Sequence, residues 1–162
     1  ELPAGASRAV LAFAPPLRVE RWSANGYSVH RGALMYSLPL TPNFTVTAHH
    51  FGGDDQSNDY DAVASTPWRV AIELDPAAPD KSLRFERRHA LAAGAAPWNH
   101  TGWPTVVHAT VRPLPSWGVV NGSATEPPPS PACANATCGD AYDVVLVPHG
   151  ATDLRIGMLP LA

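Results

Sequence analysis

Short segments in which apolar and polar residues alternate recur along the chain between turn-forming residues. In one of them Phe44, Val46 and Ala48 fall on one face, and the threonines between them fall on the other. A period of two residues is typical of a half-buried β-strand. This alternation at 43–50 and 68–74, together with short β-type runs between turn-forming residues, predicts strands over 8–13, 17–22, 33–38, 43–50, 68–74, 83–87, 105–112, 142–147 and 153–158.

The number and spacing of these segments predict the fold class. About nine short strands separated by turns indicate an all-β fold, an antiparallel β-sandwich of the jelly-roll type. No segment carries a sustained 3.6-residue apolar stripe, and 18 prolines among 162 residues suppress long helices. Residues 89–96 are expected to form a loop because Gly94 and Pro97 interrupt them. The length is that of one domain, residues 1–162.

Residues 113–141 differ in composition from the rest of the chain. They contain Glu-Pro-Pro-Pro-Ser-Pro at 126–131, which favours an extended polyproline conformation. Because closing a longer loop costs little additional entropy, a single domain tolerates such an insertion. We therefore expect 113–141 to be a long, exposed, proline-rich loop between two strands.

Four of the six asparagines stand in the Asn-x-Ser/Thr pattern that accepts N-linked glycans: Asn43, Asn99, Asn121 and Asn135. With 20 serines and threonines among 162 residues, chance would give roughly 0.7 such sites. The excess predicts a secreted or cell-surface glycoprotein with covalent N-glycans at solvent-facing asparagines. Since no signal peptide is visible, a chain that uses these sites is expected to be a processed piece of a longer precursor.

The predicted compartment bears on the two cysteines. Cys133 and Cys138 are separated by four residues, with Asn135 between them. An even number of cysteines in an oxidising compartment usually pairs, so a disulfide is expected, with two free thiols as the alternative. Zinc is not indicated, because the spacing is not Cys-x2-Cys and no second ligand pair follows. No metal and no cofactor other than the covalent glycans is expected.

Charge and hydropathy bear on two classes of partner. The formal net charge of −3 gives no reason to expect the basic face that nucleic acid requires. No apolar run reaches the length of a helix that crosses a bilayer. Neither nucleic acid nor a membrane span is therefore predicted.

Candidate catalytic chemistry is sparse. The segment 49–61 combines two histidines with four aspartates that could hold a hard cation, but the spacing is not that of a calcium loop, and solvated turns are the favoured interpretation. Glu73, Asp75, Asp80 and Glu86 are carboxylates of the kind used in sugar hydrolysis, but nothing in the sequence pairs them. No nucleophile-elbow, phosphate-loop or zinc-protease motif is present. Enzymatic activity is not expected of this chain.

Three tryptophans form a candidate carbohydrate-binding surface. Trp98, Trp103 and Trp117 lie in segments rich in proline and glycine. Indole rings can stack on sugars from such loops, but they can equally pack beneath them. Both interpretations stay open from the sequence.

Several segments resemble the glycoside hydrolase family 127 proteins, the β-L-arabinofuranosidase-like group. The segment 30–38, His-Arg-Gly-Ala-Leu-Met-Tyr-Ser-Leu, is similar to a family strand of the type RGPLVYAL. The segment 66–75 resembles the family's PWNYAL segment, and 107–118 looks like a strand that ends near a tryptophan. The most specific likeness is 145–156, Val-Leu-Val-Pro-His-Gly-Ala-Thr-Asp-Leu-Arg-Ile, which is similar to LVPYGATKLRI. Departures include Ala33 in place of proline and His149 in place of tyrosine.

This resemblance carries an implication about catalysis. In the family these motifs lie in the C-terminal β-sandwich region that follows a catalytic helical barrel. The family's zinc-binding cysteines and glutamate belong to that barrel, and no position of this chain matches them. The resemblance therefore implies a noncatalytic β-sandwich region, and it leaves the activity of the parent protein open.

A second resemblance concerns Pro127, Pro128, Pro129 and Pro131. The Pro-Pro-Pro-Ser-Pro run is similar to motifs of hydroxyproline-rich wall glycoproteins. The resemblance implies hydroxylation and O-glycosylation of these four prolines.

Together these features predict a noncatalytic β-sandwich domain of a secreted glycoprotein, with a structural or assembly role in an extracellular fibre or matrix. An unpaired sheet edge is expected to be completed by a neighbouring chain. One alternative is a carbohydrate-binding accessory module of a family-127-like hydrolase whose barrel is absent from this chain. Another is a fragment of an arabinofuranosidase that needs its barrel for activity.

Overall fold

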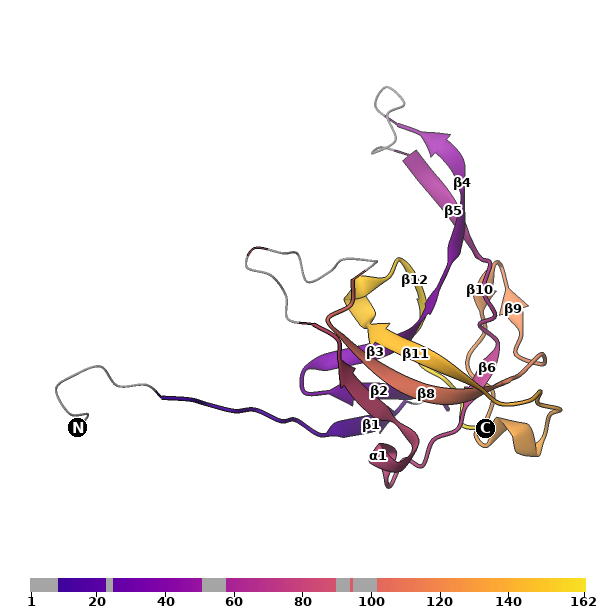
Figure 1. The fold of residues 1–162 in the computed structure, drawn as a ribbon. Coiled ribbons are helices and arrows are strands. Elements are labelled where there is room, and N and C mark those ends of the chain that lie inside the picture. Colours follow the sequence, from indigo (N-terminus) through magenta and orange to yellow (C-terminus); the bar gives the residue numbers. More distant parts are fainter. Residues whose placement is uncertain (1–8, 23–24, 51–57, 90–93, 95–101) are drawn as a thin grey trace.

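The computed structural model describes residues 9–22, 25–50, 58–89, 94 and 102–162. Their regular structure consists almost entirely of β-strands (Figure 1). The strands are β1 (Leu17–Arg21), β2 (Tyr27–Arg31), β3 (Leu34–Leu40), β4 (Pro42–His49), β5 (Asn58–Ala64), β6 (Val70–Ile72), β7 (Arg84–Arg87), β8 (Thr105–Pro113), β9 (Val119–Val120), β10 (Ser123–Ala124), β11 (Tyr142–Pro148) and β12 (Leu154–Ile156). The helical elements are α1 (Pro79–Ser82) and two 3₁₀ turns, η1 (Ala132–Ala134) and η2 (His149–Ala151).

Eight of the strands form one antiparallel, hydrogen-bonded path. Its order is β1-β2-β3-β11-β8-β6, and β12 and β7 add to β3 and β8. β8 pairs with β11 along one edge, whereas its other edge is shared between β7 in the first half and β6 in the second. Because β8 pairs with two short strands, β7 and β6, along one edge, the sheet can curl around its apolar face.

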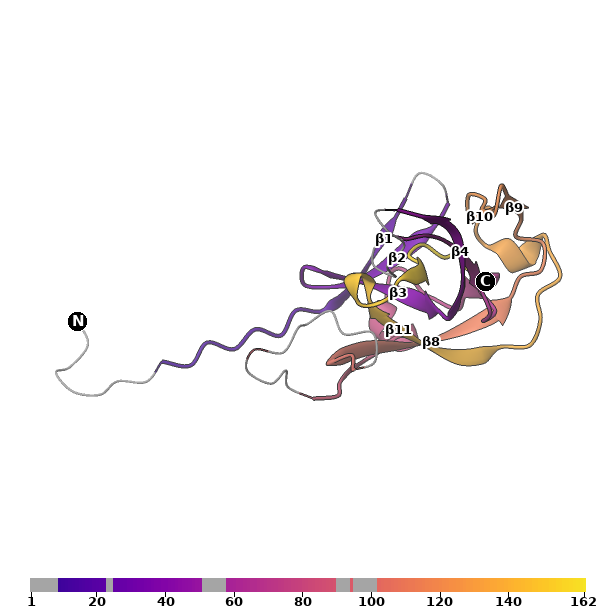
Figure 2. The ribbon, with the colours of Figure 1, turned by 90° about the horizontal axis from the view of Figure 1, so that it is seen from above.

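Residues 159–162 join the two sides of this curled sheet. The backbone amide of Tyr27 in β2 donates to the carbonyl of Leu159 at 2.8 Å, and the amide of Leu159 donates back at 3.0 Å. On the other side, the amide of Ile72 in β6 donates to the carbonyl of Pro160 at 2.8 Å, and the amide of Ala162 donates to the carbonyl of Ile72 at 2.9 Å. The sheet therefore closes into a barrel-like ring, which is visible from above in Figure 2.

The all-β fold class predicted from the sequence is confirmed. The sandwich is not confirmed, because hydrogen bonds connect the curled strands in one continuous path instead of leaving two separate sheets. No helix in the described part of the chain is long and apolar enough to cross a membrane.

The ring encloses the apolar core. Val107, Val111 and Leu114, on and just after β8, are completely buried. Trp117 is only 2% exposed, and its indole Nε1 donates to the carbonyl of Thr125 at 3.0 Å. Its ring meets that of Trp68 edge to face, with 5.4 Å between centroids. The indole thus has both the apolar contacts and the hydrogen-bond partner that a buried tryptophan requires.

The proline-rich segment 113–141 packs some of its apolar residues against this core, although many of its residues, Asn121 and Asn135 among them, are exposed. Leu114, Trp117, Pro127 and Ala132 are all buried. The amide of Ala132 donates to the carbonyl of Leu161 at 2.7 Å, so the segment is hydrogen-bonded to residues 159–162, which close the ring. The physical reason is that its apolar residues find a place over the core, which composition alone does not reveal.

The predicted disulfide is confirmed. Cys133 and Cys138 are bonded to each other, and both are packed against the core. The side chain of Arg112 donates from Nε to Glu73 at 2.6 Å and from Nη1 to the carbonyl of Gly139 at 3.4 Å. These bonds attach the cross-linked segment to β8 and to the residue after β6.

Two segments project from the ring (Figure 1). One is the hairpin of β4 and β5, a two-stranded sheet of its own. The other is residues 9–16, an extended segment without strand pairing that we call the arm. The arm contains most of the strand predicted over 8–13; within the described residues, that prediction of a paired strand is wrong.

Candidate functional site

A mostly apolar depression lies at the base of the projecting hairpin, and we call it the groove. It has a volume of about 530 Å³. Its walls come from 62–64 of β5, from 122–124 at β10, from Leu154–Ile156 of β12, and from Leu40, Trp68 and Val119. Leu40 and the partly buried Trp68 belong to the core cluster or pack against it, so the floor of the groove is continuous with the core.

Strand edges surround the groove. Among the described strands, β5 pairs with β4 alone, β10 with β9 alone and β12 with β3 alone. Each therefore has a second edge that pairs with no other described strand. Free edges present amide and carbonyl groups to which an extended segment can add.

The hairpin carries exposed apolar side chains away from the ring. Phe44 is 53% exposed and Val63 is 66% exposed. The rings of Phe44 and Tyr60 meet edge to face, with 5.8 Å between centroids, on one face of the hairpin. A lone two-stranded hairpin is marginally stable in water, so a partner that covers this apolar surface would stabilise it.

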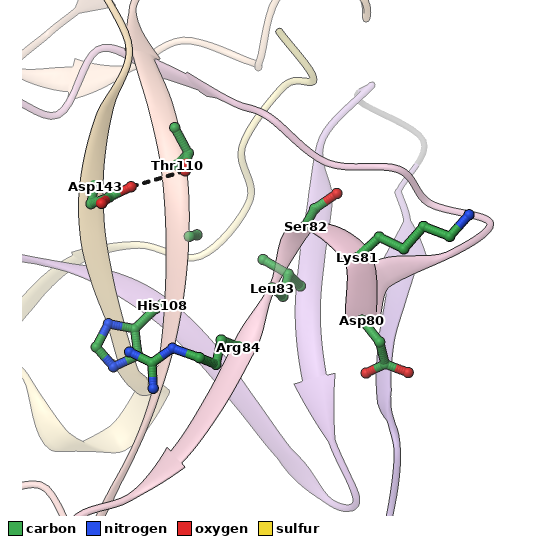
Figure 3. Close-up of a pocket in the computed structure, with 9 residues that line it drawn as sticks. Asp80, Lys81, Ser82, Leu83, Arg84, His108, Thr110 and Asp143 are labelled. Atoms are coloured by element: carbon green, nitrogen blue, oxygen red, sulfur yellow. Dashed lines mark hydrogen bonds between the residues drawn. The ribbon is translucent and has the colours of Figure 1, made fainter.

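A polar depression of about 420 Å³ lies on the outside of the ring, beside α1, β7, β8 and β11. Figure 3 shows its charged side chains pointing in different directions: Asp80 and Lys81 extend away from Thr110 and Asp143. The hydroxyl of Thr110 donates to Asp143 at 3.0 Å. The lining contains no tryptophan, tyrosine or phenylalanine ring on which a sugar could stack. The arrangement therefore lacks the converging groups of an acid–base site.

Charges at the margin of this depression are neutralised locally. His108 Nε2 lies 2.5 Å from Glu86 Oε2, and the guanidinium groups of Arg84 and Arg88 lie 3.7 and 3.5 Å from the same carboxylate. The hydrogen bond from His108, and then the charges of His108, Arg88 and Arg84, lower the pKa of Glu86. A carboxylate held ionised in this way is a poor general acid near neutral pH.

A serine–histidine pair near β3 has hydrogen bonds that do not suit nucleophilic catalysis. His149 Nδ1 lies 2.7 Å from Ser37 Oγ, and Arg155 Nε lies 3.0 Å from His149 Nε2. Arginine can only donate, so Nε2 accepts and the proton of the neutral ring resides on Nδ1. His149 thus donates to Ser37 and cannot accept the proton of its hydroxyl. Burial, and then the charge of Arg155, lower the pKa of His149.

A second serine–histidine pair lies on β2. Trp22 Nε1 donates to Ser28 Oγ at 2.7 Å, which leaves the hydroxyl of Ser28 free to donate to His30 Nε2 at 2.7 Å. Glu20 approaches the same nitrogen at 3.5 Å, so the carboxylate does not orient the far side of the ring. Ser28 is 1% exposed, which closes it to a substrate. Burial lowers the pKa of His30, although the charge of Glu20 opposes the shift.

Three of the four asparagines predicted to carry N-glycans lie at the surface, and their glycosylation stays a prediction. Asn43, Asn121 and Asn135 are all exposed, and Asn99 lies outside the described residues. Asn121 and Gly122 form the two-residue turn between β9 and β10, with φ values of 51° and 78°. Asn-Gly is the typical sequence of such a turn. This dipeptide therefore indicated the β9–β10 hairpin, which was not predicted because its strands are only two residues long.

The predicted tryptophan surface is corrected in part. Trp117 is buried, so its ring is not available for stacking on a sugar. Trp103 is half-buried, and its Nε1 donates to the carbonyl of Ala151 at 3.0 Å. Trp98 lies outside the described residues. Packing beneath loops, the second interpretation of these residues, is what holds for Trp117.

The four prolines predicted to be O-glycosylated differ in their exposure to solvent. Pro127 is buried, and its Cγ lies 3.0 Å from the position that a Cβ on Gly26 would take. A sugar attached there has no room, so Pro127 is removed from the predicted set. Pro129 and Pro131 are exposed and Pro128 is half-buried; their hydroxylation stays a prediction.

The aspartate-rich segment after His50 is only partly turn. Asp59 and Asp61 lie in β5, where His50 Nε2 lies 2.9 Å from Asp59 Oδ2. Asp54 and Asp55 fall outside the described residues. Within the described part of the chain, no cluster of histidine, cysteine or carboxylate side chains could hold a metal ion. Tyr60, Ala62 and Ala64 belong to a strand that pairs with β4, whereas the Gly-Gly-Asp-Asp stretch at 52–55, for which a solvated turn is expected, lies outside the described residues.

Comparison of the chain with protein-family models, with curated proteins and with solved structures found no match. The resemblance to glycoside hydrolase family 127 therefore stays a prediction.

Proposed function

We propose that this chain is a noncatalytic structural domain of a secreted glycoprotein and that it assembles with neighbouring chains into an extracellular fibre or matrix. The observation that carries the proposal is the groove. It combines an apolar floor, exposed apolar residues such as Val63, and strands with a free edge in one place.

Several features support an assembly role over catalysis. The two serine–histidine pairs have proton positions or burial that do not suit nucleophilic attack, and the polar depression has diverging side chains. The exposed acceptor asparagines and the disulfide suit an oxidising, glycosylating compartment. Apolar surface beside open strand edges suits a chain that adds to another.

The test is the state of association of the whole chain, secreted from a eukaryotic host so that the acceptor sites can be used. We expect sedimentation velocity to show species larger than the monomer, increasing with concentration. Val63→Arg places a charge in the groove and should abolish these species. Val120→Arg is the matched control, since Val120 is 60% exposed and does not line the groove. A wild-type chain that stays monomeric at all concentrations would contradict the proposal.

The glycoprotein part has its own measurement. Intact mass of material from the native source should fall on enzymatic removal of N-glycans. Unmodified Asn43, Asn121 and Asn135 would contradict a secretory origin.

A further inference from the structure

The arm carries the three most exposed large apolar side chains among the described residues. Val10, Leu11 and Phe13 are 76%, 78% and 80% exposed. Residues 9–14 carry no charge and no proline, so each residue of this stretch offers both an amide and a carbonyl for strand pairing. The short apolar run predicts a strand, yet the arm pairs with no other described strand.

The groove has the complementary properties. It is apolar, it is open to solvent, and it is walled by strands β5, β10 and β12, each with an edge that pairs with no other described strand. An extended segment that adds to such an edge places alternate side chains on the same side. In the arm, Leu11 and Phe13 are two residues apart, so both can enter the groove together.

The arm of one copy is not placed to reach the groove of that same copy. The arm leaves the ring at β1, whereas β9 and β10 lie at the opposite end of the molecule in both Figure 1 and Figure 2. Pro15 and Pro16 end the arm immediately before β1, and the ring of Pro15 packs against Gly32. Paired prolines favour an extended, stiff connection, which directs the arm away from its own ring.

We propose that the arm of one copy inserts into the groove of a second copy and adds as a strand to its open edge. Leu11 and Phe13 occupy the apolar floor. This inference rests on the proposed assembly function and names the segment and the surface that carry it. Because the arm and the groove lie at opposite ends of the molecule, the contact is head-to-tail, and its repetition yields an open filament unless the rotation between copies closes a ring.

The experiment uses two variants of the whole chain. The arm variant, Leu11→Asp with Phe13→Asp, keeps an intact groove. The groove variant, Val63→Arg, keeps an intact arm. We expect each variant alone to sediment as a monomer. We expect their equimolar mixture to form a one-to-one heterodimer that does not grow, because only one productive arm–groove contact is available between them.

Controls separate this inference from the broader assembly proposal. If the wild-type chain associates and the arm variant associates equally well, assembly stands and the arm inference is wrong. If each variant is monomeric alone and their mixture stays monomeric, the arm and the groove do not bind each other, and the inference is overturned. Circular dichroism should show that each variant folds; should Val63→Arg fail this check, Val119→Arg replaces it, since Val119 also lines the groove and is 42% exposed.

Discussion

The ring and the β4–β5 hairpin are both antiparallel β-structure, but they differ in what their apolar residues contact. In the ring, Val107 and Val111 are completely buried. In the hairpin, Phe44 and Val63 are more than half exposed although they alternate in the same way. The ring is complete within one chain because residues 159–162 bridge β2 and β6. The hairpin has only one pairing edge in use on each strand, so its apolar residues have no layer above them.

This difference indicates where stability and association reside. Removal of apolar surface from water stabilises the fold roughly in proportion to the area buried. Side chains of the ring therefore contribute to folding, whereas the exposed side chains of the hairpin and the arm contribute little. Substitutions in the two regions should accordingly separate loss of folding from loss of assembly.

The largest expected effect comes from the core. Trp117→Ala removes a buried indole with its edge-to-face contact to Trp68 and its hydrogen bond to Thr125. We expect a loss of about 3–5 kcal/mol in the free energy of unfolding. Phe44→Ala on the hairpin is the counterpart, and its cost should stay below about 1 kcal/mol. Urea unfolding of the monomer measures both, and equal losses would contradict the distinction between the two regions.

A smaller expected loss of stability tests whether segment 113–141 unfolds together with the ring. Replacement of both Cys133 and Cys138 by serine removes a cross-link between residues five positions apart. The chain-entropy relation gives a loss of about 2 kcal/mol for so short a loop. Because the segment packs on the core, we expect this loss in global unfolding. An unchanged unfolding midpoint would indicate that the segment unfolds independently of the ring.

The smallest expected effect is a dependence of the folding stability on pH. His30 and His149 have lowered pKa values in the fold, chiefly because burial disfavours their charged forms. Below the ordinary histidine pKa of about 6.5, the unfolded chain therefore binds protons that the folded chain does not. We expect full histidine-dependent stability above about pH 6.5 and a progressive loss as the pH falls from there toward the lowered folded values.

Thermal unfolding between about pH 7 and pH 5 measures this loss and stays above the range in which Glu20 and Glu86 titrate. His149→Gln should flatten the pH dependence, and His89→Gln, at an exposed position outside the strands, should leave it unchanged. A wild-type midpoint that rises on acidification would contradict the expected direction of the pH dependence.

Alternation and turn residues were sufficient to predict most strands of the ring. The segments 105–112 and 142–147 correspond to β8 and β11, which pair with each other through five residues of register. β2 and β5 were not predicted: the segment 27–31 was assigned to no strand, and the aspartates of β5 were grouped with a polar segment of candidate metal ligands. The groove was not predictable, since its walls come from β5, β10 and β12, and nothing in the sequence indicates that these segments meet.

By itself, the sequence determined the all-β class, the cysteine pair that forms the disulfide, and asparagines suited to glycosylation, because each depends on local periodicity or on residues close together in the chain. The tertiary structure decided that 113–141 packs on the core, that Trp117 is buried, and that residues 159–162 close the ring. It also decided that the strand-like arm pairs with no other described strand. These outcomes depend on which distant apolar surfaces meet, and alternation specifies that a face is apolar without specifying what covers it.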